Sequence, residues 1–260
     1  MSSPGDVIGG DPIPQRDLGA ILDAAFKIYG ANANKLFVIV AVVVVPLSLI
    51  SHLLTGVVFA ARSTGFLIAT TLITALITLI TYAILQAALI RGAAQATVGD
   101  AVDVETSYKW GLRKFGWVLL VSIATGIMVV IGFILLIVPG VILLTRFTVA
   151  IPALVIEDRK GIEAIDRSWN LTKGHFWHVL GTVVVAALIT GVVSGIISTI
   201  GMLAGSSWFT GWVFGSIGEI IVAPFSALVS IILYLDLRAR TEGLTATALR
   251  TALREAPSSS

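Results

Sequence analysis

Five long runs of almost uninterrupted apolar residues divide the chain, and each exceeds the roughly 20 residues that a membrane-crossing helix needs. The runs are Leu36–Ala60, Phe66–Ile90, Phe115–Val138, Phe176–Leu203 and Trp208–Leu237. A sixth run, Gly140–Ile156, is shorter and contains Arg146. It cannot continue the third run, because one helix over both would be about 60 Å long, twice the hydrocarbon thickness. Pro139-Gly140 predicts a turn between them. The pattern therefore predicts six membrane-spanning helices.

Polar and apolar positions alternate with a helical period before the first, third and fifth of the six predicted spans, counted in chain order. The clearest case is 162–176, where Ile162, Ile165 and Trp169 share one face and charged residues fill the other. Such a helix lies in the membrane interface with its aromatic side chains among the headgroups. The predicted interfacial anchors are Tyr108, Trp110, Trp117, Trp169 and Trp177. Two spans follow each stretch, which indicates three parallel helix–span–span repeats, although any six-span protein with interfacial helices would show this order.

The composition fixes the class as an all-α membrane protein. Hydrophobic residues make up 57% of the 260 and charged residues 12%, against roughly half and about a quarter in soluble domains. The absence of cysteine from the sequence excludes disulfides, thiolate nucleophiles and cysteine zinc sites. A net charge of +2 is not gathered into one patch, which argues against nucleic acid as a partner.

The basic residues are sorted by the side of the membrane that they face. All 17 lysines and arginines except Arg62 and Arg146 fall before, between or after the spans on one side. By the positive-inside rule that side is the cytoplasm, which places both termini there. Residues 1–15 are predicted to be a disordered tail, 16–245 the membrane domain, and 246–260 a cytoplasmic helix and tail.

Two charged residues fall inside predicted spans. Glu219 is the one acidic residue in the interior of a span, and it and Arg146 both lie about 10 Å from the outer ends of their helices. Each unpaired charge costs about 2.5–3.5 kcal/mol at mid-membrane. Three interpretations remain open: an ion pair that locks the two spans together, a polar site for a substrate, proton or lipid headgroup, or an Arg146 that extends towards the outer surface. Pro152 and Pro224 predict kinks beside these residues.

Catalytic and metal-binding patterns are absent from the sequence, which predicts no catalytic residue, cofactor or metal site. The three histidines, His52, His175 and His178, have no third ligand nearby in sequence. His52 is expected to donate to a neighbouring backbone carbonyl or to headgroup water. No nucleophile elbow, zincin motif or phosphate-binding glycine loop occurs. Glycine pairs at 191/195, 201/205 and 211/215 indicate close packing of the last two spans.

Three segments carry a family resemblance: "LGAILDAAFKIY", "PGVILLTRFTVAIPALVIEDRKGIEAIDRSWNLTKGHFW" and "YLDLRARTEG". Over roughly residues 16–245 the chain resembles the bacterial membrane domain of glycerophosphoryl diester phosphodiesterase, including its stand-alone relatives. Some members add a catalytic barrel of about 250 residues, whereas about 20 residues follow the last span here. The resemblance implies a six-helix membrane fold and a link to lipid or envelope metabolism, without the enzymatic activity.

The expected function is that of a non-enzymatic, polytopic protein of the bacterial cytoplasmic membrane with a supporting or lipid-associated role. Its partners are then the bilayer itself and anionic headgroups, which basic interfacial helices attract at about 1 kcal/mol per residue. The alternative is a transporter or channel whose polar centre contains Arg146 and Glu219. The sequence indicates no substrate and no protein partner.

Overall fold

The computed structural model describes residues 13–60, 64–205, 207–245, 247–249 and 251, which are helical apart from short connections. The helices are α1 (Leu18–Ala60), α2 (Thr64–Thr97), α3 (Val104–Leu135), α4 (Ile137–Phe147), α5 (Ala150–Glu157), α6 (Ile162–Thr172), α7 (Phe176–Ala204) and α8 (Trp208–Glu242). Within the described ranges, six segments are long and apolar enough to cross a membrane, α4 and α5 together forming the fourth. The predicted count of six spans and the all-α membrane class are confirmed.

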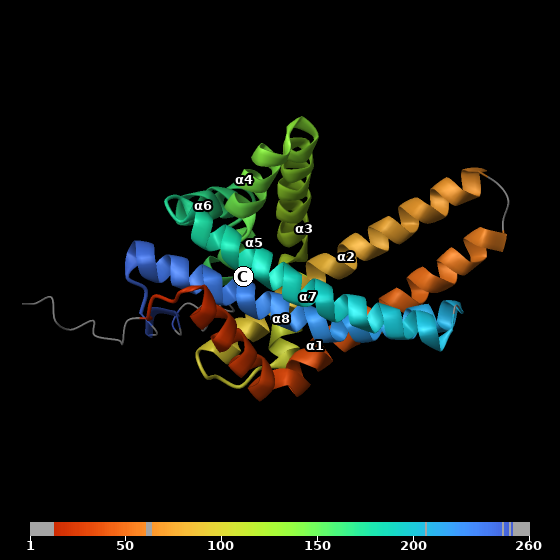
Figure 1. Ribbon diagram of the computed structural model, residues 1–260, viewed down its shortest axis with the longest axis horizontal. Helices are drawn as coiled ribbons and strands as arrows, with labels where there is room; N and C mark the ends of the chain where they lie inside the picture. The colour runs from red at the N-terminus through yellow and green to blue at the C-terminus, as the bar shows by residue number, and fades with distance from the viewer. Residues whose placement is uncertain (1–12, 61–63, 206, 246, 250, 252–260) are drawn as a thin grey trace, which may run out of the picture.

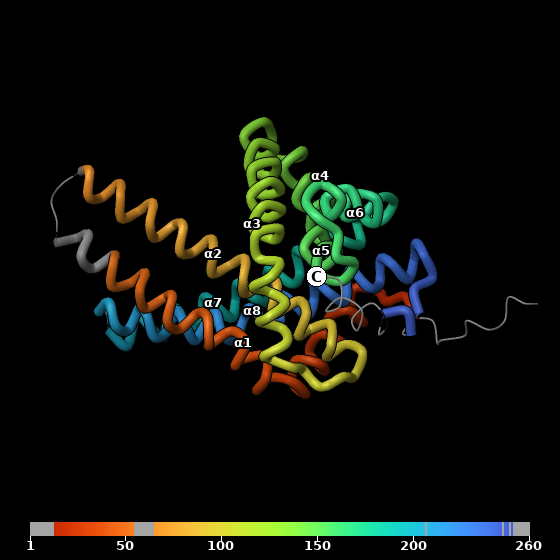
Figure 2. The backbone as a smooth tube through the Cα atoms, turned by 180° about the vertical axis from the view of Figure 1, so that it is seen from behind, coloured from red at the N-terminus to blue at the C-terminus, as the bar shows by residue number. Residues whose placement is uncertain are grey.

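Three helical hairpins leave a common hub (Figure 1). They are α1/α2, α3/α4 and α7/α8, and the α3/α4 hairpin points away from the other two in both views (Figure 2). The hub contains the start of α1, the end of α2, the start of α3, α5, α6 and the end of α8. These hairpins are the counterpart of the predicted repeats, but the three copies differ in the helix that precedes them.

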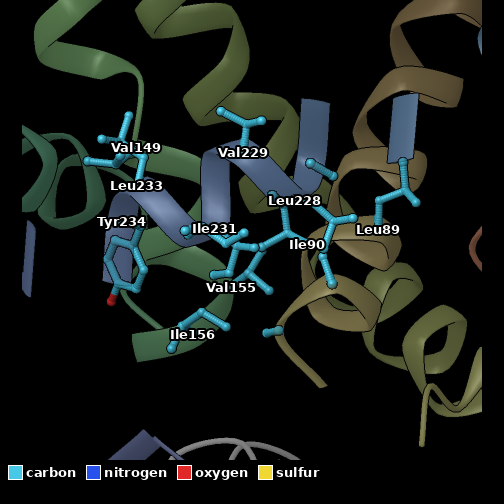
Figure 3. Close-up of a cluster of buried hydrophobic side chains, with 14 of the residues drawn as sticks. Leu89, Ile90, Val149, Val155, Ile156, Leu228, Val229, Ile231, Leu233 and Tyr234 are labelled. Carbon is cyan, nitrogen blue, oxygen red and sulfur yellow. The ribbon is translucent and has the colours of Figure 1, made fainter. Parts of the chain in front are cut away.

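The buried core lies at the hub. Leu89 and Ile90 of α2, Val155 of α5, and Leu228 and Ile231 of α8 are at most 1% exposed and face one another (Figure 3). By contrast, the most apolar stretch of α7 has no buried residue. Exposed apolar faces of this kind are stable in lipid, whose tails are as apolar as leucine. The hairpins are therefore covered by the bilayer, and the protein packs on itself at the hub.

The interfacial segments before the first and third spans are continuous with those spans. α1 has 43 residues and α3 has 32, whereas α6 is a separate helix of 11 residues. The third segment is separate because the chain turns at a glycine. Gly174, between α6 and α7, has φ +86°, a conformation that glycine adopts without strain. Gly30 and Gly116 lie within the long helices. At two of the three places, therefore, the interfacial segment and the span form one continuous helix.

The fourth span begins earlier than expected and contains a break. Leu136 is the extended residue between α3 and α4, so the predicted turn at Pro139-Gly140 is wrong by three residues. Proline is tolerated in the first turn of a helix, where its missing N–H would have no partner. Gly140 instead allows close contact, since a Cβ on Gly132 would lie 3.0 Å from its Cα. The kink predicted at Pro152 is confirmed, because α4 and α5 separate just before it.

The two ends of the chain meet at the hub. The backbone N–H of Ile13 donates to the carbonyl of Leu244, with the two atoms 3.0 Å apart. Most of the predicted N-terminal tail (1–15) lies outside the described residues, as does most of the predicted C-terminal segment (246–260). Residues 247–249 and 251 of the latter are described, and they are helical.

Candidate functional site

Arg146 and Glu219 do not form the predicted ion pair. Arg146 lies against α6 and the start of α7, while Glu219 lines a cavity with residues of α1 and α2. No ion pair joins them in the described part of the chain. The prediction relied on equal depth along two spans, and these spans belong to hairpins that diverge from the hub. The polar centre containing both residues, on which the transporter alternative rested, is likewise wrong.

Arg146 is held by an aromatic ring and a hydroxyl group. Its guanidinium carbon lies 5.1 Å from the ring centre of Trp169, within the range of a cation–π contact. Its Nη1 lies 3.5 Å from Oγ1 of Thr172, while its buried Nε has no partner among the described residues. The carbonyl of Arg146 accepts a hydrogen bond of 2.6 Å from Ser168. Three residues of α6 thus fix the place of this arginine without supplying a counter-ion.

An apolar groove of about 500 Å³ runs from Arg146 between α4 and α7. Its other lining residues are Ile137, Val138, Val141, Ile142, Phe176, Trp177 and Leu180. Trp177 is 79% exposed and stands at the first turn of α7. The groove therefore combines one cation with a wall that is otherwise hydrocarbon.

Glu219 lines a second cavity, of about 470 Å³, between α1, α2 and α8. Six of the lining residues carry hydroxyl or imidazole groups: Ser48, Ser51, His52, Thr78, Thr81 and Tyr82. At its edge, Trp212 Nε1 donates to Ser48 Oγ at 3.0 Å, and Ser48 Oγ lies 3.0 Å from Ser216 Oγ. His52 Nδ1 lies 3.0 Å from the Ser48 carbonyl, which confirms the predicted hydrogen bond to the backbone.

A charged network closes the hub. The Glu157 carboxylate accepts hydrogen bonds from Tyr234 (2.5 Å), Arg167 (2.8 Å) and Arg159 (2.7 Å). Glu242 pairs with Arg167 and, at 3.0 Å, with Arg238 on its own helix. The network joins the end of α5 to α6 and α8. Its side chains other than Arg159 are at most 33% exposed, so solvent screens these pairs less than ordinary surface pairs.

Asp236, which is fully buried, ties the N-terminal segment to α7 and α8. Its carboxylate accepts from the Arg16 backbone N–H at 2.6 Å and from Arg240 at 2.7 Å. His178 Nε2 lies 2.9 Å from the same carboxylate. Asp236 pairs with Arg240, and Arg238 with Glu242, each four residues apart on α8, the spacing at which helical side chains are neighbours. Asp236 is covered by Arg16 and His178, which are distant in sequence, so it is not at a solvated end of the helix.

Two groups outside the spans have shifted pKa values. Burial alone would lower the pKa of Arg167, but its hydrogen bonds to Glu242 and Glu157 outweigh this effect and raise it. The pKa of Asp103 is lowered by hydrogen bonds from the side chain and the backbone of Thr106. Asp103 is the N-cap of α3, accepting from the Thr106 N–H at 3.1 Å. Its carboxylate therefore stabilises the start of that helix.

The predicted interfacial anchors have different surroundings. Trp110 is 1% exposed, and the centre of its ring lies 5.6 Å from the guanidinium carbon of Arg91. The prediction that Trp110 anchors in the interface is therefore wrong. Tyr108 donates to the carbonyl of Ile39 and is half-buried. Trp117, Trp169 and Trp177 are exposed, and their contact with headgroups stays a prediction.

Neither the ring contact of Arg146 nor the serine cluster at Ser48 was identified from the sequence. The sequence contained a signal for the contact of Arg146 with the Trp169 ring, since both residues are prominent in the segments that carry the family resemblance. It contained little signal for the cluster at Ser48, because isolated serines and threonines occur throughout the spans. Among the described residues, no group of three or more His, Asp or Glu side chains is arranged to hold a metal ion.

The fold and these sites define a polytopic, all-α membrane protein with six spans. The family of the membrane domain of glycerophosphoryl diester phosphodiesterase matches residues 116–238, which confirms the resemblance predicted from the sequence. The match begins within α3, ends near the C-terminus of α8 and includes Arg146, Glu157 and Glu219. No curated protein and no solved structure matches the chain.

Proposed function

We propose that this chain is a non-enzymatic membrane protein that binds anionic lipid, with Arg146 holding the headgroup phosphate and the groove between α4 and α7 holding an acyl chain. The observation that carries the proposal is a guanidinium that has no carboxylate partner in the described part of the chain and opens onto an apolar groove. A lipid phosphate supplies the missing counter-ion, and arginine matches its oxygens with paired N–H donors.

The side chains around the Arg146 guanidinium lie near headgroup depth, although the residue itself is in the middle of the span Ile137–Glu157. Its guanidinium neighbours Thr172, at the end of α6, and it shares the groove with Phe176 and Trp177, at the start of α7. Exposed tryptophan at the start of a span is typical of the membrane–water interface. A phosphate bound to Arg146 would thus lie where phosphates of the bilayer already are, and its acyl chain would follow the apolar wall.

The location and the non-enzymatic role are part of the proposal. The matched family is described as a membrane domain, and its name refers the catalytic activity to the phosphodiesterase of which it is a part. The basic residues on the hub side support a bacterial cytoplasmic membrane with both termini in the cytosol. Reporter tags at the two termini and at the connection 61–63 would test this orientation, which requires the termini and the connection to report opposite sides.

Lipid binding is tested with purified protein in nanodiscs that contain phosphatidylglycerol or phosphatidylcholine, with retained lipid counted by native mass spectrometry. We expect selective retention of phosphatidylglycerol and a loss of about tenfold in Arg146→Gln, equivalent to about 1.4 kcal/mol. Lys173→Gln is the matched control, since Lys173 is an exposed cation at the end of the same helix α6. Equal losses in the two variants would show a diffuse charge effect and refute the site.

A further inference from the structure

The cavity at Glu219 is separate from the lipid groove at Arg146, and its polar lining indicates a different ligand. Glu219 lies on the span Trp208–Glu242, and no ion pair to it occurs among the described residues. A carboxylate at that depth costs several kcal/mol unless it is neutralised or hydrated. The titratable side chains that line its cavity are His52 from α1 and Tyr82 from α2. α7, which also packs on α8, has no ionisable side chain over Val179–Ala204.

His52 is arranged to exchange a proton in this cavity. A carbonyl oxygen only accepts, so the 3.0 Å contact with Ser48 places a hydrogen on Nδ1 of His52. In neutral His52 the other ring nitrogen, Nε2, then carries a lone pair. Nε2 has no hydrogen bond within the described part of the chain, and His52 lines the cavity together with Glu219. A basic nitrogen and a carboxyl group thus share one polar space.

The cavity continues along α2 towards the start of that helix. A neighbouring space of about 620 Å³ is lined by Thr70, Thr71, Thr74, Ala75, Thr78, Leu79 and Tyr82. Thr78 and Tyr82 line both spaces. From Thr70 to Tyr82 the helix rises about 18 Å, so the two spaces follow α2 over more than half of a hydrocarbon core of about 30 Å.

The threonines of α2 present acceptor atoms along this path. Thr70 donates to the Phe66 carbonyl at 2.7 Å, and Thr78 donates to the Thr74 carbonyl at 2.9 Å. Thr81 donates to the Ile77 carbonyl at 2.7 Å. Because each of these hydroxyl hydrogens is used within the helix, the oxygens offer lone pairs. Such a lining suits water and hydrated protons better than anions.

The path is closed at the hub. Leu85, the last residue of α2 that lines the cavity, is 3% exposed. Beyond it, Leu89 and Ile90 pack against Leu228 and Ile231 of α8 (Figure 3), and none of these four is more than 1% exposed. The two spaces along α2 therefore end at the hub, beside Glu219.

We propose that Glu219 and His52 form a proton-binding site inside the membrane, which exchanges protons with the aqueous phase on the side where α2 begins, through the threonine-lined face of α2. The site binds and releases a proton at the Glu219 carboxylate, and His52 sets the pH at which this occurs. Closure at the hub makes the exchange one-sided. The proposal does not depend on the lipid groove at Arg146.

Access is tested with single cysteines, for which the chain is well suited because it contains none. Thr74→Cys and Ile73→Cys are made in the full chain, and right-side-out vesicles are treated with a membrane-impermeant thiol reagent. Thr74 lines the path, whereas Ile73, 48% exposed, is not among its lining residues and serves as the matched control. We expect labelling at Thr74→Cys alone and from one side. An unreactive Thr74→Cys, or equal labelling of both, would overturn the access route.

Proton binding is tested with dicyclohexylcarbodiimide, which modifies protonated carboxyl groups in apolar surroundings. Peptide mass spectrometry should show modification of Glu219 that increases several-fold as the pH falls from 9 to 6. Glu157, held by three cationic or hydroxyl donors at the hub, should stay unmodified and is the internal control. An absent or pH-independent modification of Glu219 would overturn the site, as would protection by sodium, which would indicate a metal cation as the ligand.

The role of His52 has a separate readout. A protonated imidazole favours the ionised carboxylate, so His52→Gln should move the modification profile of Glu219 to higher pH. His175→Gln is the control, because His175 lies at the start of α7, near the hub. A profile that does not move in His52→Gln would remove His52 from the site. Thermal melting of each variant separates a changed profile from misfolding.

Discussion

The hub network gives a quantitative prediction for Glu157→Gln, which keeps the side-chain volume and removes the charge. A hydrogen bond to a charged group contributes about 1.5–3 kcal/mol and a neutral one about 0.5–1.5, so each strong bond to Glu157 should lose about 1 kcal/mol. Tyr234 and Arg167 make two such bonds, at 2.5 and 2.8 Å. The bond from Arg159 contributes little, since that side chain is 44% exposed.

A further loss follows because Arg167 and Arg238 would be left with Glu242 as their shared carboxylate. Removing one partner of a buried pair costs about 3–5 kcal/mol where the other charge is left unpaired; because Glu242 still pairs with both arginines, we expect this further loss to be only about 1 kcal/mol. We therefore expect Glu157→Gln to lower the free energy of unfolding by about 3 kcal/mol, whereas Tyr234→Phe, which removes one bond, should cost about 1.5–3 kcal/mol.

Unfolding is followed by tryptophan fluorescence during titration of mixed micelles with sodium dodecyl sulfate. Glu105→Gln is the matched control, because Glu105 pairs with Lys109 and these side chains are 76% and 69% exposed. That variant should change the free energy by no more than about 0.5 kcal/mol. If Glu157→Gln proved as mild as Glu105→Gln, the hub would be held together by apolar packing, and the reasoning from the charged network would be refuted.

Three further predictions concern single positions. The stabilisation that the Asp103 carboxylate gives to the start of α3 is fully present above about pH 4, the ordinary carboxyl pKa. It is lost as the pH falls through the lower pKa that Asp103 has in the folded state. Asp103→Asn should keep the cap and remove this acid sensitivity from melting curves. Gly201→Val should cost about 1–3 kcal/mol in the same titration, because a Cβ there would lie 2.9 Å from Cβ of Phe214, whereas Gly195→Ala, with open space around it, should be close to neutral. Asp236→Asn should increase the rate of proteolysis after Arg16, whose backbone N–H the carboxylate holds, and an unchanged rate would contradict the anchoring role.

The number of spans could be predicted because the length of an apolar run is a local property of the sequence. The pairs within the last helix were accessible for the same reason, since residues four apart on a helix are neighbours. The contact of His52 with the backbone carbonyl of Ser48 is also local. In each case the partner lies within one helical turn, so no knowledge of tertiary packing was required.

The contacts between helices could not be predicted in the same way. Equal depth suggested that Arg146 and Glu219 meet, but depth along a helix does not determine which faces of two helices come together. Trp110 was expected among the headgroups, and the structure buries it against the Arg91 guanidinium of α2. Among the paired glycines, Gly201 makes the expected close contact, whereas a Cβ placed on Gly191 would meet no other helix within 4 Å among the described residues.

The meeting of the chain ends determines the order in which the molecule can be completed. Each hairpin exposes its apolar surface to lipid and can enter the bilayer as a unit while synthesis continues. Arg16 and Ile13, however, bind Asp236 and Leu244, more than 200 residues later in the chain. These contacts can therefore form only after the last helix has been synthesised, so the N-terminal segment is joined to its partners as the final step of assembly.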